Sequence, residues 1–393
     1  MDEGINIKRY YMRKRILIDA TTIVEKKDGL SQYIISFLDH LPEETFELFD
    51  LSVLVNKGVE RQELWEVIRR RNFTVIEAVI APIGPKREWH MFWFFKQHNN
   101  KFDLFHSTSN QYPLCLKKGI ATVHDITFKK YLDAKWWTFN AAKRFLNLVI
   151  KNALYRSSAV IAVSEYTKQD LVNNYRLSNK VSDKINVIYE GWEHLKTNVS
   201  EKQNSDVMPD FSNYLFYVGT TRLHKNMKNL LRAFNIASKT LPLSIKLVIT
   251  GNETYLDDPD KAVIQEINRN GERVFFTGFV SGYILEQLFK NCDAFIFPSL
   301  SEGFGIPVLE AFYFNKPLLC SNTTSLPEIA GNAALYFNPA DIEDIARAIG
   351  GFYSSAPLVK EQLIENGKKR MALFSWQKTA AEIVVLYKQL LLQ

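Results

Sequence analysis

Two glutamates, Glu302 and Glu310, border a short segment whose residue types suit a phosphate or a hydroxyl-bearing ligand. Pro307 fits the first helical position, and such a helix start offers free N–H groups and a positive dipole end to an anion. Gly303 and Gly305 allow a ligand to come close to the backbone. We expect Glu302 in the turn and Glu310 in the first helical turn, so that both carboxylates border one small volume. A plain strand-to-helix connection has much the same composition, and the local pattern leaves both interpretations open.

Strands that alternate with helical segments are expected to position these residues. In the N-terminal half, short apolar runs end at polar residues at 15–20, 48–55, 73–80, 102–107, 120–125, 159–164 and 185–191. After a polar stretch the pattern restarts, with runs at 214–220, 245–251, 273–279 and 294–299. This alternation predicts an α/β fold with parallel, doubly wound sheets. Because 393 residues exceed one average domain, we expect two such domains facing each other across a cleft.

The domain boundaries follow from the polar stretch and from the end of the chain. We place an N-terminal domain at 1–195, a linker at 196–211 and a C-terminal domain at 212–373. Residues 374–393 predict a final amphipathic helix that Ser375 caps. At about 1.5 Å per residue, this helix is long enough to return to the N-terminal domain.

The composition excludes several classes of protein. With 46% hydrophobic and 23% charged residues, the chain reads as a folded globular protein. Its cysteines lie far apart, which disfavours a disulfide framework or a zinc site. The first fifteen residues are charged where a signal peptide needs an apolar core, and no apolar run has the length of a membrane span. We therefore expect a cytoplasmic protein. A net charge of +6 does not by itself indicate a nucleic-acid partner, and we expect none.

The sequence around the two glutamates resembles that of a known family. The segment FPSLSEGFGIPVLEA, residues 297–311, resembles the signature of retaining glycosyltransferases of the GT-B fold, in particular members of the bacterial surface-polysaccharide type in the large family 4, which uses nucleotide sugars. Other segments resemble the same family in the expected order, at 16–33, 121–128, 217–234, 323–341 and 374–391. The resemblance covers nearly the whole chain and implies two Rossmann-like domains, the first for the acceptor and the second for a nucleotide-sugar donor.

The resemblance also implies a role for each site residue. Glu310 would accept hydrogen bonds from the donor ribose, and Glu302 would face the donor sugar. Lys225 would meet the diphosphate as negative charge grows on it. His124 would lie under the sugar from the first domain, although without the resemblance it reads as a structural histidine, as His106 does. The segment that follows Glu302 and the strand end near Lys225 would contact the donor through Gly303, Phe304, Gly305, Ile306, Gly219, Thr220 and Arg222.

Several positions carry weaker expectations. Many relatives have an arginine where this chain has Thr220, so Arg222 is the substitute phosphate ligand. Gly29 and Ser31 would lie near the diphosphate or the acceptor, although a simple helix start explains both. Ser325 and Glu328 fit a capping box.

The implied reaction is transfer with retention of configuration. A hexose or deoxyhexose, with mannose favoured, would move from a nucleoside diphosphate sugar to a hydroxyl of a glycan or lipid-linked oligosaccharide in O-antigen or capsule synthesis. We expect no further cofactor and no metal, because no Asp-x-Asp element stands where a metal-dependent GT-A enzyme needs one. A GT-B epimerase and a non-catalytic nucleotide-sugar-binding protein remain alternatives. A dinucleotide-dependent oxidoreductase is excluded, because no G-x-G-x-x-G follows the first strand.

A basic and aromatic strip lies at 85–156. Its 72 residues hold thirteen Lys and Arg against four Asp and Glu. Segment 85–96 mixes Lys86, Arg87 and Lys96 with large aromatic side chains, and Trp136 and Trp137 begin the next helical stretch. A pair of ordinary surface helices explains this composition. The alternative is a face that rests on anionic lipid, on the inner side of the cytoplasmic membrane.

Overall fold

Two parallel β-sheets form the framework of the chain in a computed structural model. The structure describes residues 13–23, 25, 28–98, 101–131, 136–197, 211–219, 222–251 and 256–392. The predicted linker lies mostly outside these ranges, as do Thr220 and the side chains of Trp136 and Trp137. Within them, no helix is long and apolar enough to cross a membrane.

The first sheet has seven strands in the order β3-β2-β1-β4-β5-β6-β7. Asp19 at the end of β1 pairs in register with Leu54 of β2 on one side and with Ser107 of β4 on the other. Each strand coincides with a predicted apolar run, and the ends of strand and run differ by at most four residues. The prediction of these seven strands is confirmed. Their bounds are β1 Lys14–Asp19, β2 Phe49–Asn56, β3 Thr74–Ala78, β4 Leu104–Ser107, β5 Ile120–Val123, β6 Ala159–Ala162 and β7 Ile185–Val187.

The second sheet has six strands in the order β10-β9-β8-β11-β12-β13. Four of them were predicted, and the apolar runs that form β12 and β13 were not identified as strands. The bounds are β8 Tyr214–Val218, β9 Lys246–Thr250, β10 Val274–Phe276, β11 Ala294–Phe297, β12 Leu318–Ser321 and β13 Ala334–Phe337.

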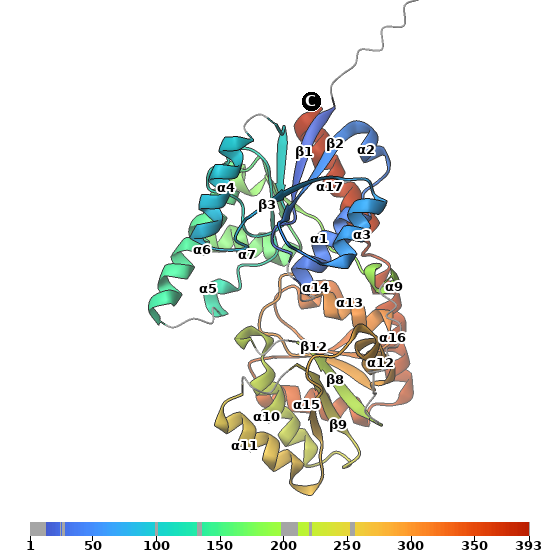
Figure 1. Ribbon diagram of the computed structural model, residues 1–393. Helices are drawn as coiled ribbons and strands as arrows, with labels where there is room; N and C mark the ends of the chain where they lie inside the picture. The colour runs from blue at the N-terminus through green and yellow to red at the C-terminus, as the bar shows by residue number, and fades with distance from the viewer. Residues whose placement is uncertain are drawn as a thin grey trace, which may run out of the picture. The chain divides into compact units, whose positions relative to one another are not determined.

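Helices lie on both sides of each sheet (Figure 1). On the first sheet, Met91 and Phe94 of α4 pack against Leu17, Leu54 and Phe105 of the strands. The helices of the first half are α1 Gly29–Asp39, α2 Glu44–Leu48, α3 Gln62–Arg70, α4 Pro85–Gln97, α5 Phe128–Tyr131, α6 Trp136–Arg156, α7 Glu165–Tyr175, α8 Asn179–Ser182 and α9 His194–Thr197. Those of the second half are η1 Leu223–Lys225, α10 Met227–Ser238, α11 Asp258–Ile267, η3 Asn268–Asn270, α12 Gly282–Asn291, α13 Ile306–Tyr313, α14 Leu326–Ala330, α15 Ile342–Ser354, α16 Pro357–Met371 and α17 Trp376–Leu391.

The chain divides into two compact units. The first contains residues 1–122, 148–160 and 380–393, and the second contains 123–147 and 161–379. The chain returns to the first unit within α17, whose start is capped by the Ser375 hydroxyl, which accepts from the Lys378 N–H at 3.3 Å. The predicted cap is confirmed.

Candidate active site

The carboxyl ends of β8 and β11 bring two predicted site residues together. From these two neighbours the strand order continues to β9 and β10 on one side and to β12 and β13 on the other. Ligands of open α/β sheets bind at the point where the strand order reverses in this way, the switch point. Lys225 ends the short helix η1 after β8, and Glu302 lies in the turn after β11. Lys225 Nζ lies 2.7 Å from Glu302 Oε1, with side chains 19% and 13% exposed. A cation and a carboxylate therefore form an ion pair at the edge of the sheet.

Hydrogen bonds to backbone carbonyls hold the two loops of this pair against each other. Asn226 has a left-handed φ of 62°, and its Nδ2 donates to the carbonyls of Pro298 at 3.0 Å and Pro339 at 2.7 Å. The Leu300 N–H donates to the His224 carbonyl at 2.7 Å. Asn tolerates the left-handed region better than most residues, which explains this residue type between η1 and α10. The position of Lys225 is thus fixed by the strand that carries Glu302.

The turn that carries Glu302 is held from β12 by two side chains. Thr324 Oγ1 accepts from the Glu302 N–H at 3.3 Å, and the Ser325 hydroxyl donates to the carbonyls of Glu302 and Phe304 at 3.1 and 2.9 Å. Thr324 has φ of 59°, a genuine outlier for a β-branched residue and a form of strain that occurs at functional sites.

The predicted capping box at Ser325 is wrong. Ser325 precedes α14 but its side chain makes no cap hydrogen bond, because it is engaged by the Glu302 turn. Glu328 instead accepts from the N–H groups of Glu165 and Tyr166 at 2.8 and 3.0 Å, at the start of α7. Both side chains are structural, but they support elements other than their own helix.

Glycine is required at two positions of the turn. A Cβ on Gly303 would lie 1.8 Å from the His124 carbonyl oxygen, inside the second unit. Gly305 has φ of 106°, and a Cβ there would lie 2.7 Å from Leu326 Cδ2. The Ser164 hydroxyl donates to the Gly303 carbonyl at 2.5 Å. Close backbone approach within the fold, as well as any approach of a ligand, accounts for both glycines.

Helix α13 begins one residue earlier than predicted, which changes the position of Glu310. Ile306 is its first residue and Pro307 its second, so Glu310 is the fifth and lies in the second turn, not the first. Burial raises the pKa of the Glu310 carboxyl to about 7, and the charge of Lys225 opposes that shift. A carboxyl with this pKa changes its charge near neutral pH. The Phe304 side chain before the helix is buried, 4% exposed.

The other predicted site residues lie after β8 and after β5. Arg222 is exposed and precedes η1, and a Cβ on Gly219 would lie 2.5 Å from the Tyr217 hydroxyl. His124 follows β5, and its Nδ1 lies 3.3 Å from Glu190 Oε1. The buried Glu190 was not predicted, because nothing in the local sequence after β7 distinguishes it.

Gly29 and Ser31 belong to the first unit, where they form the start of α1. Asp28 caps the helix by accepting from the Ser31 N–H at 2.7 Å, and nothing lies within 4 Å of a Cβ on Gly29. The cap uses only the backbone N–H of Ser31, and the buried Ser31 hydroxyl has no hydrogen-bond partner among the described residues. His106 is a structural histidine, as predicted: its two ring nitrogens contact Tyr387 and Thr122, and burial lowers its pKa to about 3.

Three polar atoms beyond the carboxyl ends of the second sheet were missed by sequence reasoning. His224 Nδ1, Ser299 Oγ and Thr323 Oγ1 follow β8, β11 and β12, and each is buried without a hydrogen-bond partner in the part of the chain that the structure describes. Their place in the segments that follow neighbouring strands was the available signal. Across the same ranges, no group of three or more His, Cys, Asp and Glu side chains is arranged to hold a metal ion.

Two family models match the chain, one for each half. Residues 27–193 match Glycosyltransferase Family 4, and residues 198–370 match Glycosyl transferases group 1. The chain belongs to glycosyltransferase family 4. The Lys225–Glu302 pair and the start of α13 therefore lie in the half of a family 4 enzyme that the group 1 model covers.

Curated relatives and solved structures agree with this family and with the GT-B fold. The chain is 25% identical to O-antigen chain mannosyltransferase B of Escherichia coli over 90% of the chain and 89% of the relative. It is 26% identical to O-antigen chain mannosyltransferase RfbU of Salmonella typhimurium, over 85% and 90%. Among solved structures, HepE of Anabaena in complex with UDP and glucose has a TM-score of 0.68 at 16% identity, over 96% of this chain and 100% of that one. The predicted GT-B fold of this family 4 glycosyltransferase is confirmed.

Proposed function

We propose that the chain transfers a hexose, with mannose favoured, from a nucleoside diphosphate sugar to a hydroxyl of a glycan or lipid-linked oligosaccharide in surface-polysaccharide synthesis. The observation that carries this proposal is the gathering of Lys225, Glu302 and the start of α13, with Glu310, at one switch point. Both relatives are O-antigen chain mannosyltransferases, which supports mannose as the sugar and surface-polysaccharide synthesis as the pathway.

The donor would be held by charge and by the helix start. The positive end of the α13 dipole and the ammonium of Lys225 suit the two phosphates of a nucleoside diphosphate. The ionised Glu310 carboxylate can accept from two adjacent ribose hydroxyls. The helix start and Lys225 supply positive potential without a metal ion or another cofactor, so we propose that none is needed.

The chemical step would use the same cation. Lys225 is paired with Glu302 in the structure, and an arriving diphosphate would share or replace that partner. The attraction grows as the phosphate leaves with increasing negative charge, so Lys225 would stabilise the transition state more than the ground state. The acceptor hydroxyl would attack from the face that the phosphate leaves, which retains the configuration, and the leaving phosphate oxygen would take the hydroxyl proton. Glu302 would contact the donor sugar, and Glu190 would orient His124 beside it.

Thermal unfolding with nucleotides tests the donor site directly. A ligand that binds only the folded protein raises Tm, by an amount equivalent to about 2.7 kcal/mol at a concentration of 100 Kd. We expect one of GDP, UDP and dTDP to raise Tm well above the other two in differential scanning fluorimetry. In the Glu310→Gln variant, the Tm shift caused by the nucleotide should be smaller. If none of the three changes Tm at millimolar concentration, the proposed function is wrong.

The second part of the proposal is a contact with anionic lipid through the outer face of α4. Trp89, Phe92 and Trp93 are 62%, 45% and 38% exposed, beside exposed Lys86 and Lys96. Lys96 Nζ lies 4.5 Å from the centre of the Trp93 ring. Amphipathic aromatic rings and lysines on one helix face suit the headgroup region of a membrane.

One residue of the predicted strip does not belong to this face. Arg87 was expected among its basic residues, but it is completely buried. It lies on the same side of α4 as Met91 and Phe94, at spacings of four and seven residues, and so points into the first unit.

Vesicle sedimentation tests the lipid contact. At low salt, we expect the chain to sediment with vesicles that contain anionic phosphatidylglycerol, and to remain in the supernatant with neutral phosphatidylcholine vesicles. Exchanging both Trp89 and Trp93 for serine should lower the bound fraction several-fold. The matched control is Leu358→Ser, because Leu358 is 72% exposed on α16. Equal sedimentation with both kinds of vesicle, or none with either, would contradict the proposal.

A further inference from the structure

Two hydroxyl groups at the start of α7 hold the residue that follows Glu302. The Gly303 carbonyl accepts from the Ser164 hydroxyl at 2.5 Å and from the Thr167 hydroxyl at 3.1 Å. Ser164 and Thr167 are buried, with exposed fractions of 0% and 1%, and like Gly303 they belong to the second unit. The turn between β11 and α13 therefore depends on α7 for its position.

Thr167 also contacts the backbone of a second predicted site residue. Its Oγ1 lies 3.2 Å from the His124 carbonyl oxygen, in addition to its contact with Gly303. The two backbone segments pack directly against each other, since a Cβ on Gly303 would lie 1.8 Å from that oxygen. One hydroxyl group thus links the backbone of His124 to the turn that carries Glu302.

The two hydroxyls supply a hydrogen for each of the two carbonyls. A hydroxyl has one hydrogen to donate and can also accept. When Ser164 donates to Gly303, the Thr167 hydroxyl can donate to His124. Ser164 is also the N-cap of α7 and accepts from the Thr167 N–H at 3.0 Å. Because this cap uses the backbone of Thr167, the Thr167 hydroxyl is not needed to start the helix.

The start of α7 is itself held in place by α14. Glu328 accepts from the N–H groups of Glu165 and Tyr166 at 2.8 and 3.0 Å. With the cap at Thr167, the first three N–H groups of α7 all have partners within the protein, so this helix start is a support and not an anion site. Catalytic groups have to be held to within about 0.5 Å, and a helix start that is fixed in this way can provide such a support.

We propose that Thr167 is a positioning residue for the sugar end of the donor site. Its hydroxyl fixes the spacing between His124 and Glu302, and the part of these two side chains in the reaction rests on the proposed function. The nucleotide would be held by Lys225 and Glu310 instead. Loss of the Thr167 hydroxyl should therefore slow the chemical step and leave the binding of the nucleoside diphosphate unchanged.

Thr167→Val tests this role, because valine has nearly the shape of threonine but no hydroxyl group. We expect kcat to fall about 10- to 100-fold, as for a displaced catalytic group, while the nucleoside diphosphate Kd keeps its wild-type value. Mannose release from GDP-, UDP- and dTDP-mannose measures kcat, and isothermal titration with GDP, UDP and dTDP measures Kd. Thr167→Ser keeps the hydroxyl and should retain the wild-type kcat, although the loss of a buried methyl group lowers its Tm.

Thr379→Val is the matched control for the loss of a buried hydroxyl. Thr379 is also 1% exposed, and its hydroxyl donates to the backbone carbonyls of Tyr189 and Ser375. This variant should lower Tm as Thr167→Val does and keep the wild-type kcat. If the valine variant of Thr167 does not fold, Thr167→Ala replaces it. Alanine and serine at this position differ only in the hydroxyl, so the alanine variant should have the lower kcat.

The ring resonances of His124 give a readout that does not depend on turnover. In ¹H–¹⁵N spectra of protein with labelled histidine, assigned with His124→Gln, we expect Thr167→Val to shift these resonances and Thr379→Val to leave them in place. Wild-type kcat in Thr167→Val, unshifted His124 resonances, or an equal loss of kcat in Thr167→Ser or Thr379→Val would overturn the inference. If the wild-type protein releases mannose from none of the three donors while the His124 shift is observed, the proposed function is contradicted instead.

Discussion

Lys225→Met is expected to lower kcat by about 10² to 10³, the usual effect of removing one preorganised group that stabilises developing charge. Methionine keeps the unbranched shape of the side chain up to the ε carbon and removes the charged ammonium group. The nucleotide Kd should rise by less than kcat falls, because the attraction increases as the leaving phosphate gains charge. The rate of sugar release from the donor, with and without acceptor, measures the effect. Release at the wild-type rate would refute the role of Lys225.

The loss of fold must be separated from the loss of catalysis in this experiment. Without Lys225, the mostly buried Glu302 has lost its cation, which lowers stability. The double variant Lys225→Met, Glu302→Gln removes that unpaired charge and should recover Tm while remaining inactive. Lys228→Met is the matched control. Lys228 lies three residues after Lys225, at the start of α10, and pairs with Asp257 and Asp260 instead of Glu302. If the double variant regains activity together with Tm, the lysine is structural.

The strands that carry the site were predictable because each is a short apolar run that ends at a polar residue. The pairing of Lys225 with Glu302 across 77 positions was not, because it depends on β8 and β11 being neighbours in the sheet. Periodicity within a segment contains no information on strand order. The family resemblance named both residues, but their contact comes from topology.

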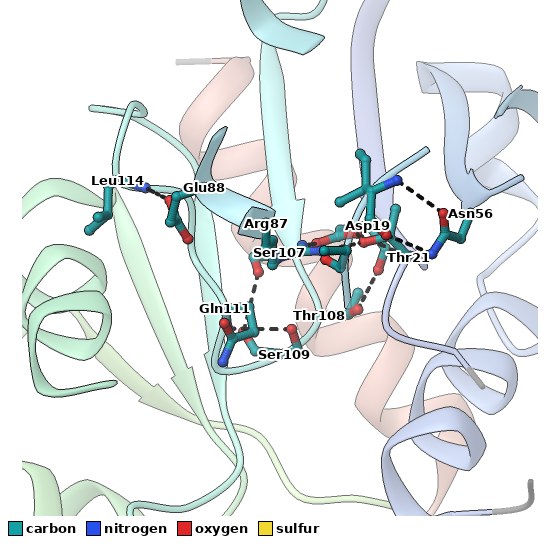
Figure 2. Close-up of polar contacts among 12 residues, drawn as sticks. Asp19, Thr21, Asn56, Arg87, Glu88, Ser107, Thr108, Ser109, Gln111 and Leu114 are labelled. Carbon is teal, nitrogen blue, oxygen red and sulfur yellow. Dashed lines mark hydrogen bonds and ion pairs between the residues drawn. The ribbon is translucent and has the colours of Figure 1, made fainter. Parts of the chain in front are cut away.

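Two other features of the structure could not be predicted from residue type, the backbone conformation of Thr324 and the burial of Arg87 beside Asp19 (Figure 2). Thr324 has a left-handed φ, which is expected of glycine or asparagine. Its hydrogen bond to the Glu302 N–H therefore could not be predicted from the sequence. Arg87 was the opposite case. Its helical spacing to Met91 and Phe94 predicts an inward direction, but its charge suggested the surface, and the buried partner Asp19 lies 68 positions away. Burial of a charge can be predicted only when its partner is known.

Glu310→Gln and Glu302→Gln are expected to have opposite effects on binding and turnover. Loss of the Glu310 carboxylate should raise the nucleotide Kd about 10- to 100-fold, as for hydrogen bonds to a charged group worth about 1.5 to 3 kcal/mol. Glu302→Gln should leave the nucleotide Kd unchanged or lower it, because Lys225 is then released from its ion pair. Its kcat should fall about 10²-fold. Isothermal titration with the nucleoside diphosphate and steady-state kinetics provide both quantities, and an exchange of the two patterns would refute the assignment.

The pH dependence of nucleotide binding gives a second measure of the Glu310 role. Burial raises the pKa of this carboxyl to about 7, and only the ionised form accepts from both ribose hydroxyls. Affinity should therefore be complete above pH 7 and be lost as the pH falls through it, with a Kd about tenfold higher at pH 6 than at pH 8. Glu310→Gln, which cannot ionise, should remove the step between these pH values. A wild-type Kd that stays constant from pH 8 to pH 6 would show that the ribose is held by another group.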